Sequence, residues 1–220
     1  MKTRVLTIFY IITGILFILI ENNSSEPVQL ILKALIIPWL IVMLFINLKP
    51  FENRINTLML LGLIFSWAGD MVLQLTFVPG LILFLLAHLM YLAAFFMTPG
   101  ESTIFTKRIW LLIPVLLYGT GLCWYLYSDL GDMRLPVIVY AAVILLMLTG
   151  ALNRFEKVNG SSYRLILAGA ILFVLSDSAI AVNRFSCDFD YSGFVIMSTY
   201  IAAQYLITIG YIRQFTDRVR

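Results

Sequence analysis

Apolar runs of helix length follow one another along almost the whole chain, and short segments containing proline, glycine, asparagine or serine separate them. Pro79-Gly80, Pro99-Gly100 and Asn159-Gly160 are examples of these separators. An α-helix needs about 20 predominantly apolar residues to cross the hydrocarbon core of a bilayer. Strands are not expected, because an open sheet edge cannot satisfy its backbone groups in lipid. The pattern therefore predicts an all-α, polytopic membrane helical bundle.

The composition indicates a membrane protein without a separate soluble domain. Of the 220 residues, 61% are apolar and only 12% are charged, whereas soluble domains are about half apolar and about a quarter charged. The mean hydropathy is +0.96. No polar stretch is long enough to fold by itself, so residues 1–220 are predicted to form a single transmembrane domain.

The runs and their separators predict eight transmembrane helices. Glycines at 62, 69, 169 and 210 are expected to let neighbouring helices pack closely. The predicted spans are residues 5–20, 28–48, 57–77, 81–97, 109–127, 135–152, 165–182 and 192–212.

Lysine and arginine gather at the two termini and in alternate connections. All 15 of them, except Lys33, Arg134 and Arg184, lie at the chain ends or in the second, fourth and sixth connections. Because basic residues concentrate on the cytoplasmic side, both termini are predicted to be cytoplasmic, which requires an even number of spans. The net charge of +3 is then a topology signal, and nucleic acid is not expected as a partner.

Cysteine and histidine are too few for most metal sites. Cys123 and Cys187 cannot build a disulfide framework, and their pairing with each other is left open. His88 is the only histidine, which excludes a three-histidine zinc site within one chain. The sequence therefore predicts a site without a metal or another cofactor.

Two aspartates lie inside the apolar runs, Asp70 in the third predicted span and Asp177 in the seventh. A carboxylate in hydrocarbon is costly, so a membrane helix that keeps one is expected to use it. The predicted topology puts both acids, together with Lys33 and His88, in the outer half of the membrane. The four side chains could meet only if their helices are neighbours.

Other polar residues accompany the acids. Ser66 and Gln74 lie four residues either side of Asp70, so the three share one helix face. Such a stripe points into the bundle or into a water-filled cavity, or it joins helices through interhelical hydrogen bonds. Lys33 could pair with Asp177, extend to the outer headgroups or bind a lipid phosphate.

His88 and Tyr91 lie three residues apart and share a helix face, where a packing role and a role in the site are both open. The remaining candidates for binding a substrate or tuning the acids are Tyr140, Ser176, Asn183, Tyr200 and Gln204.

The two acidic segments resemble those of a known family. Leu63-Ile-Phe-Ser-Trp-Ala-Gly-Asp70 and Gly169-Ala-Ile-Leu-Phe-Val-Leu-Ser-Asp177, the latter continuing to Phe185, are similar to segments of the YhhN-like membrane proteins, which include the animal lysoplasmalogenases. The family's lysine is commonly followed by proline, whereas Ala34 follows Lys33 here. Further matches are Lys33, Pro38, Gly80, Phe84, His88, Tyr91, Tyr200 and Gln204, so the resemblance covers helices 2 to 8.

The resemblance implies hydrolysis of the vinyl ether bond of a lysoplasmalogen, with a lysophospholipid as substrate and membrane lipid as surroundings. A vinyl ether opens once its outer vinyl carbon is protonated, because the resulting oxocarbenium ion is captured by water. One acid must then be protonated and one carboxylate charged, as in glycosidases. Asp70 and Asp177 are expected to divide these roles, in an order left open, with Lys33 and His88 binding phosphate or tuning the acids. The tyrosines would orient the lipid.

Other functions fit the same acids. A transporter or channel could use them to relay protons or hold a cation. A hydrolase of another ether or ester lipid and a non-catalytic lipid-binding bundle are further alternatives. The intramembrane aspartyl proteases are disfavoured, because their Tyr-Asp and Gly-x-Gly-Asp signatures do not match Ser176-Asp177 or Trp67-Ala-Gly-Asp70. The predicted location is a bacterial inner membrane.

Overall fold

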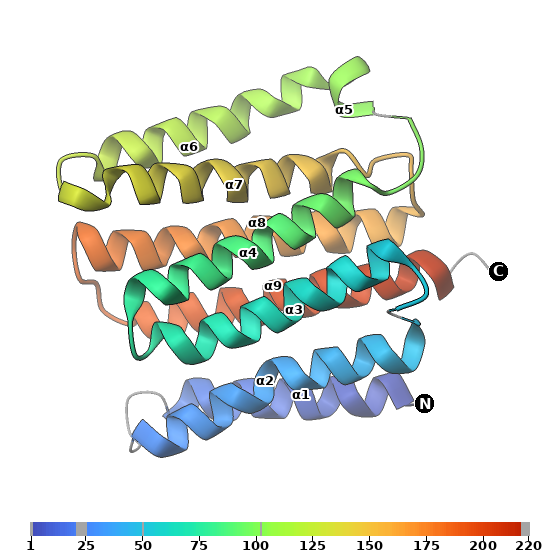
Figure 1. The fold of residues 1–220 in the computed structure, drawn as a ribbon, viewed down its shortest axis with the longest axis horizontal. Helices are drawn as coiled ribbons and strands as arrows, with labels where there is room; N and C mark the ends of the chain where they lie inside the picture. The colour runs from blue at the N-terminus through green and yellow to red at the C-terminus, as the bar shows by residue number, and fades with distance from the viewer. Residues whose placement is uncertain (1, 21–25, 50, 102, 217–220) are drawn as a thin grey trace. The chain divides into compact units, whose positions relative to one another are not determined.

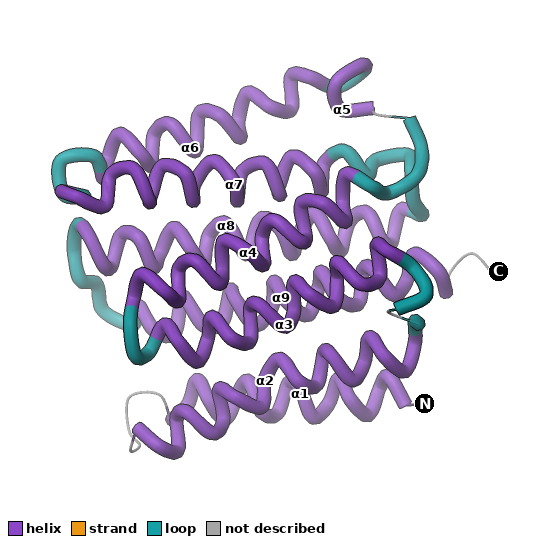
Figure 2. The backbone as a smooth tube through the Cα atoms, in the orientation of Figure 1, coloured by secondary structure: helices purple, strands orange, loops and turns teal. Residues whose placement is uncertain are grey.

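The structure is a computed structural model of the chain, and it describes residues 2–20, 26–49, 51–101 and 103–216. Within these ranges it contains helices and no strands (Figures 1 and 2). Eight of the helical segments are long and apolar enough to cross a membrane. The predicted all-α, polytopic membrane fold is therefore confirmed, while the side of the membrane that each terminus faces stays a prediction.

The long helices follow the predicted spans in number and order (Figure 1). Short helical turns precede two of them, at Ile109–Leu111 and Gly131–Met133, and the four-residue α5 (Thr103–Thr106) was not expected from the sequence. The long helices are α1 (Lys2–Ile20), α2 (Glu26–Asn47), α3 (Arg54–Leu73), α4 (Phe77–Phe96), α6 (Leu112–Leu126), α7 (Arg134–Leu152), α8 (Gly160–Phe185) and α9 (Ser192–Thr216).

The connection between α3 and α4 differs from the sequence prediction. α3 ends at Leu73 and α4 begins at Phe77, so Pro79 and Gly80 lie in the first turn of α4 and not in a loop. Proline is tolerated there, because the first amide groups of a helix have no partner within it. A Cβ atom on Gly80 would lie only 2.5 Å from the Cα atom of Leu73. Glycine therefore allows the start of α4 to lie directly against the end of α3.

The start of α8 also differs from the prediction. The helix begins at Gly160, earlier than residue 165, because Asn159 caps it. The Asn159 side chain accepts a hydrogen bond of 2.7 Å from the Ser162 backbone amide, which satisfies one of the first amide groups of the helix.

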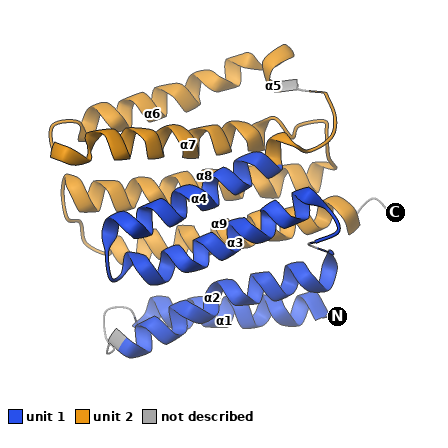
Figure 3. Ribbon diagram, viewed as in Figure 1, with its two compact units in different colours: residues 1–94 blue, residues 95–220 orange. Residues whose placement is uncertain are grey.

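The chain divides into two compact units, residues 1–94 and 95–220 (Figure 3). In the first unit, α1 packs on α2 and α2 packs on α3. The Trp39 indole donates a hydrogen bond of 3.2 Å to the Thr13 hydroxyl, and the Trp67 indole donates one of 2.9 Å to the Ala34 carbonyl. These bonds tie α2 to both of its neighbours.

The second unit is built around the close pairing of α8 with α9. A Cβ atom on Gly169 would lie 2.9 Å from the Ala203 carbonyl oxygen, and one on Gly210 would lie 2.9 Å from the Leu165 Cβ atom. Small residues let membrane helices approach in this way. α7 packs on α8, and α6 packs on α7. This stack of helices positions the second of the two aspartates.

Candidate functional site

Asp177 and Tyr140 meet where α8 packs on α7. The Tyr140 hydroxyl donates a hydrogen bond of 2.5 Å to the Oδ2 atom of Asp177. This length is typical of a hydroxyl donating to a charged carboxylate. Both residues were candidates from the sequence, where nothing related one to the other, and in the structure they are hydrogen bonded.

The pair lines a small cavity between α6, α7 and α8. The cavity measures about 50 Å³, which is enough for a few water molecules. Leu122, Val137 and Val174 are among the apolar residues around it. Asp177 thus lines a small, largely apolar space that has room for a few small molecules or groups.

Two serines flank Asp177 and form hydrogen bonds with different neighbouring helices. The Ser176 hydroxyl donates a hydrogen bond of 3.0 Å to the Ile196 carbonyl of α9. Ser178 lines the cavity, accepts a hydrogen bond of 2.8 Å from the Tyr118 hydroxyl of α6 and donates one of 2.7 Å to the Val174 carbonyl. Ser176 was the residue singled out from the sequence, but Ser178 is the one beside the cavity.

Tyr118 and Ser178 were both missed by the sequence reasoning. Ser178 could have been found from the sequence, because it adjoins Asp177. Successive residues on a helix point in different directions, so either neighbour of Asp177 could have faced the site. Nothing in the sequence distinguished Tyr118, because aromatic residues are frequent throughout the membrane helices.

Tyr200 and Gln204 lie on α9 in the same unit and do not line this cavity. The Gln204 amide donates a hydrogen bond of 3.4 Å to the Tyr200 hydroxyl, and both side chains are buried. The Tyr200 ring packs edge-on against Phe173 of α8, with ring centroids 5.5 Å apart. These two candidates belong to the packing between α8 and α9.

Asn183 lies near the end of α8. Its side-chain carbonyl accepts a hydrogen bond of 3.4 Å from the Phe189 backbone amide, which holds the loop that leads to α9. Arg184 beside it is exposed.

In the first unit, the predicted polar stripe on α3 is only partly maintained. Ser66 and Asp70 are buried, at 0% and 3% exposure. Gln74 is exposed, because α3 ends one residue earlier. It lines a pocket of about 450 Å³ with residues of α2, among them Gln29 and Leu30.

Two aromatic rings of α4 pack on glycines of α3. The Phe84 ring lies over Gly69 and the Tyr91 ring over Gly62, so close that a Cβ atom on either glycine would lie within 3 Å of the ring. His88, between Phe84 and Tyr91 along α4, is fully buried and hydrogen bonds with the backbone of Phe84. Lys33 of α2 is also buried, at 8% exposure. Four candidates, Ser66, Asp70, His88 and Tyr91, are therefore buried side chains of α3 and α4.

Arg154 is a buried charge that the sequence reasoning assigned to topology alone. It follows the end of α7 and is 0% exposed. Its guanidinium donates hydrogen bonds to Thr98 at 2.5 Å, to Gln214 at 2.7 Å and to Ser162 at 3.3 Å. Burial lowers the pKa of Arg154 to about 10, so the side chain stays charged at neutral pH.

No group of three or more histidine, cysteine, aspartate or glutamate side chains within the described ranges could hold a metal ion. Cys123 and Cys187 are both free thiols.

Comparisons with known proteins identify the family. The model of the YhhN family matches residues 28–211. A Bos taurus protein named lysoplasmalogenase TMEM86A is 34% identical over 218 residues, covering 92% of this chain and 86% of the relative. The human lysoplasmalogenase TMEM86B is 36% identical over 154 residues, covering 69% of this chain and 62% of the relative.

A Mycobacterium bovis protein named lysoplasmalogenase is 29% identical over 158 residues, covering 68% of this chain and 58% of the relative. No solved structure matches the chain. With a family match over most of its length and relatives of more than 30% identity, this chain belongs to the YhhN family of membrane proteins.

Proposed function

We propose that this protein is a membrane-embedded lysoplasmalogenase, which hydrolyses the vinyl ether bond of a single-chain ether phospholipid. The products are a fatty aldehyde and a glycerophospho-base. Family membership and the names of the relatives support the reaction class. The observation that carries the proposal is the hydrogen bond between Tyr140 and Asp177 at a small cavity inside membrane-spanning helices.

The reaction needs a proton, a water molecule and a negative charge. A proton added to the outer vinyl carbon leaves an oxocarbenium ion, whose positive charge is shared by the inner carbon and the ether oxygen. Water adds to that carbon and loses a proton, which gives a hemiacetal. The hemiacetal breaks into the aldehyde and the alcohol of the glycerophospho-base, so one water is consumed and the proton is returned.

Asp177 suits the role of the carboxylate. It accepts the hydrogen bond of Tyr140, which orients the carboxylate and leaves its negative charge beside the cavity. A fixed negative charge in a site of low polarity stabilises a nearby cation far more than it would in water. Asp177 would stabilise the oxocarbenium ion and take the proton from the attacking water.

Asp70 is our candidate for the proton donor. Among the described residues, Asp70 and Asp177 are the two aspartates inside the long helices, and Asp70 is buried on α3. Lys33 and His88, which belong to the same unit as Asp70, are proposed to tune this acid. The assignment rests on the chemistry of the reaction, which requires two carboxyl groups in different states.

The lipid is proposed to enter from the outer leaflet of a bacterial inner membrane. This follows from the predicted cytoplasmic termini, which put the carboxyl end of α8 on the outer side. Arg184 lies seven residues beyond Asp177 along α8, a rise of about 10 Å. Arg184 is therefore at a suitable height to meet a phosphate headgroup while the vinyl ether lies at Asp177.

The test uses protein purified in mild detergent, a lysoplasmalogen and its saturated-ether analogue. Wild type should release aldehyde from the vinyl ether alone. Asp177→Asn and Asp70→Asn should lower the release at least about 100-fold, whereas Asp188→Asn, in an exposed loop, should leave it unchanged. Unchanged activity of Asp177→Asn would overturn the proposed site, and transport into sealed vesicles without a new product would favour the transporter alternative.

A further inference from the structure

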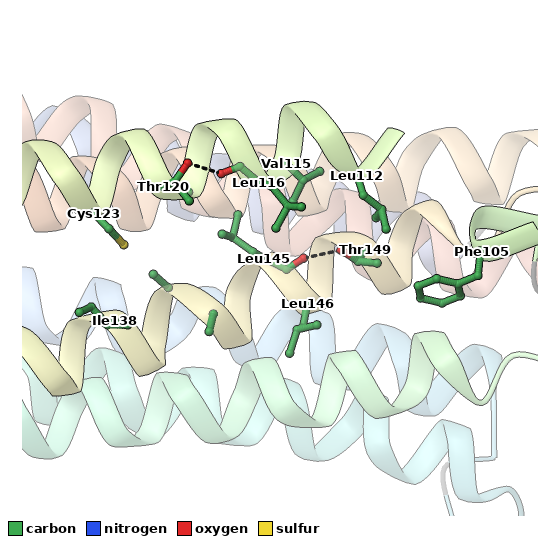
Figure 4. Close-up of a pocket in the computed structure, with 13 residues that line it drawn as sticks. Phe105, Leu112, Val115, Leu116, Thr120, Cys123, Ile138, Leu145, Leu146 and Thr149 are labelled. Atoms are coloured by element: carbon green, nitrogen blue, oxygen red, sulfur yellow. Dashed lines mark hydrogen bonds between the residues drawn. The ribbon is translucent and has the colours of Figure 1, made fainter. Parts of the chain in front are cut away.

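An apolar groove runs along the contact between α6 and α7 (Figure 4). Its volume is about 540 Å³, within the range of about 300–1,000 Å³ that is common for sites binding small organic ligands. Leu112 and Leu116 of α6 and Ile138, Leu145 and Leu146 of α7 line it. The groove therefore has the size of a ligand site and walls of hydrocarbon.

The hydroxyl groups in the lining do not face an occupant. The Thr120 hydroxyl donates to the Leu116 carbonyl at 2.7 Å, and the Thr149 hydroxyl donates to the Leu145 carbonyl at 2.9 Å. Both bonds stay within their own helix, as Figure 4 shows. With its hydroxyl groups used in this way, the groove suits an occupant without polar groups.

One end of the groove meets the cavity of Asp177. Cys123 of α6 and Ala141 of α7 line both spaces. From Ile138 to Thr149, the groove follows α7 for about 16 Å, at a rise of about 1.5 Å per residue. A chain lying in the groove would thus have one end beside the carboxylate and the other near the start of α6 and the end of α7.

We propose that the α6–α7 groove holds the alkenyl chain of the single-chain ether lipid, with the vinyl ether bond at Asp177. This inference rests on the proposed function. A vinyl ether is the junction between the hydrocarbon chain of the lipid and its polar part. In the same way, the shared wall at Cys123 and Ala141 is the junction between an apolar groove and a carboxylate.

The groove would select and position the lipid more than it would increase affinity. A chain that leaves bilayer lipid for the groove exchanges one apolar environment for another, so burial alone provides little driving force. Its contribution is to fix the distance between the chain and the reacting bond, and thereby to discriminate by chain length.

A second apolar groove provides a comparison. It measures about 290 Å³, is lined by residues such as Ile171 and Leu175 of α8, and shares Val174 with the cavity of Asp177. We favour the larger groove as the site of the alkenyl chain, because it shares a residue of α6 and a residue of α7 with the cavity. The chain would pass between these two residues to reach Asp177. Substitutions in the smaller groove therefore serve as controls.

The experiment narrows the larger groove from either wall, with Thr120→Trp on α6 and Ala142→Trp on α7. The matched controls are Gly121→Trp, where a side chain meets open space, Val139→Trp, which is exposed on α7, and Ile171→Trp in the second groove. Aldehyde release is measured with a short-chain and a long-chain vinyl ether lysolipid.

The two groove variants should lower kcat/KM for the long-chain lipid about tenfold or more and keep the short-chain activity, while the controls keep the wild-type ratio. Short-chain activity reports that each variant is folded. An unchanged ratio in both groove variants, or a change in Ile171→Trp alone, would overturn the inference.

A binding measurement separates this inference from the proposed function. A saturated-ether lysolipid with a photoreactive diazirine in its chain is crosslinked to the purified protein, and the labelled peptides are mapped. Labelling of α6 and α7 that Thr120→Trp removes supports the groove, even if wild type cleaves no vinyl ether. Labelling that falls on other helices and is unaffected by Thr120→Trp contradicts it.

Discussion

The Tyr140 hydroxyl lies 2.5 Å from the Oδ2 atom of Asp177, so that a phenol of α7 and a carboxylate of α8 are hydrogen bonded inside the second unit. This bond joins α7 to α8, and it also fixes the orientation of the carboxylate that we propose for the reaction.

Tyr140→Phe should lower kcat for aldehyde release about 10- to 100-fold, because a hydrogen bond to a charged group contributes about 1.5–3 kcal/mol. KM should change little, since the ring is retained, whereas the unfolding temperature should fall, because the lost bond also joins α7 to α8. The comparison is Tyr118→Phe, which removes a hydroxyl bonded to Ser178 at the same cavity but not to the acid. An equal loss of kcat in both variants would mean that the loss comes from disturbing the cavity and not from removing the bond to Asp177.

Asp177→Asn should have a larger effect, a loss of about 10²- to 10⁴-fold, as expected for a group that transfers protons. Asparagine keeps the volume and can still bond to Tyr140, so the protein should remain folded. The rate of aldehyde release is measured together with the unfolding temperature. A fully active Asp177→Asn protein would remove this residue from the reaction.

Arg154→Leu should destabilise the protein without altering the chemistry. It leaves buried Thr98, Ser162 and Gln214 without their guanidinium partner, at about 1–3 kcal/mol for each group that stays unsatisfied. Thermal unfolding in detergent measures the loss, and Arg164→Leu, an exposed arginine near the start of α8, is the control. The aldehyde rate per folded molecule should stay near wild type, because Arg154 lies about 20 Å from Tyr140 along α7.

The pKa of Lys157 should be below the ordinary value of a lysine side chain. Burial and the positive charge of Arg154 both lower the pKa of Lys157, burial being the larger cause. The pH dependence of acetylation, followed by mass spectrometry, should therefore show a lower midpoint for Lys157. Arg154→Gln should raise that midpoint, and a midpoint that does not move would exclude the influence of Arg154.

Gly80→Ala should lower the unfolding temperature, because the added methyl group would meet the backbone of Leu73. Overpacking of this kind destabilises by about 1–3 kcal/mol. Gly160→Ala is the matched control, since nothing lies within 4 Å of a Cβ atom there. Equal unfolding temperatures of the two variants would contradict the close approach of α4 to α3.

The predicted topology can be tested with a native cysteine. Cys187 is exposed just beyond α8, so in a Cys123→Ser protein a membrane-impermeant maleimide should label Cys187 from the outer face of the membrane. Labelling that requires access from the cytoplasm would reverse the topology, and with it the proposed entry from the outer leaflet.

Hydropathy predicted the eight helices, because the length of an apolar run is a direct consequence of bilayer thickness. The ends of the helices were less predictable. Pro79 and Gly80 are separators by composition, yet they form the first turn of α4, since a helix start tolerates proline and the neighbouring end of α3 requires glycine.

The site was predictable by residue type but not by partner. Asp177 is identified by the cost of its charge, whereas its bond to Tyr140 depends on which faces of α7 and α8 meet. Ser176 and Ser178 are equivalent neighbours in the sequence, but the helix turns one toward α9 and the other toward α6. Arg154 counted as a topology charge, because position along the chain does not reveal burial.

The α6–α7 groove is open on one side, where Leu116 and Leu146 are 62% and 50% exposed. In the proposed reaction this opening separates the two products. The aldehyde, with its chain already in the groove, can diffuse sideways into the bilayer, while the glycerophospho-base dissolves in water. The two fragments therefore leave into different phases, and neither has to pass the other on its way out of the site.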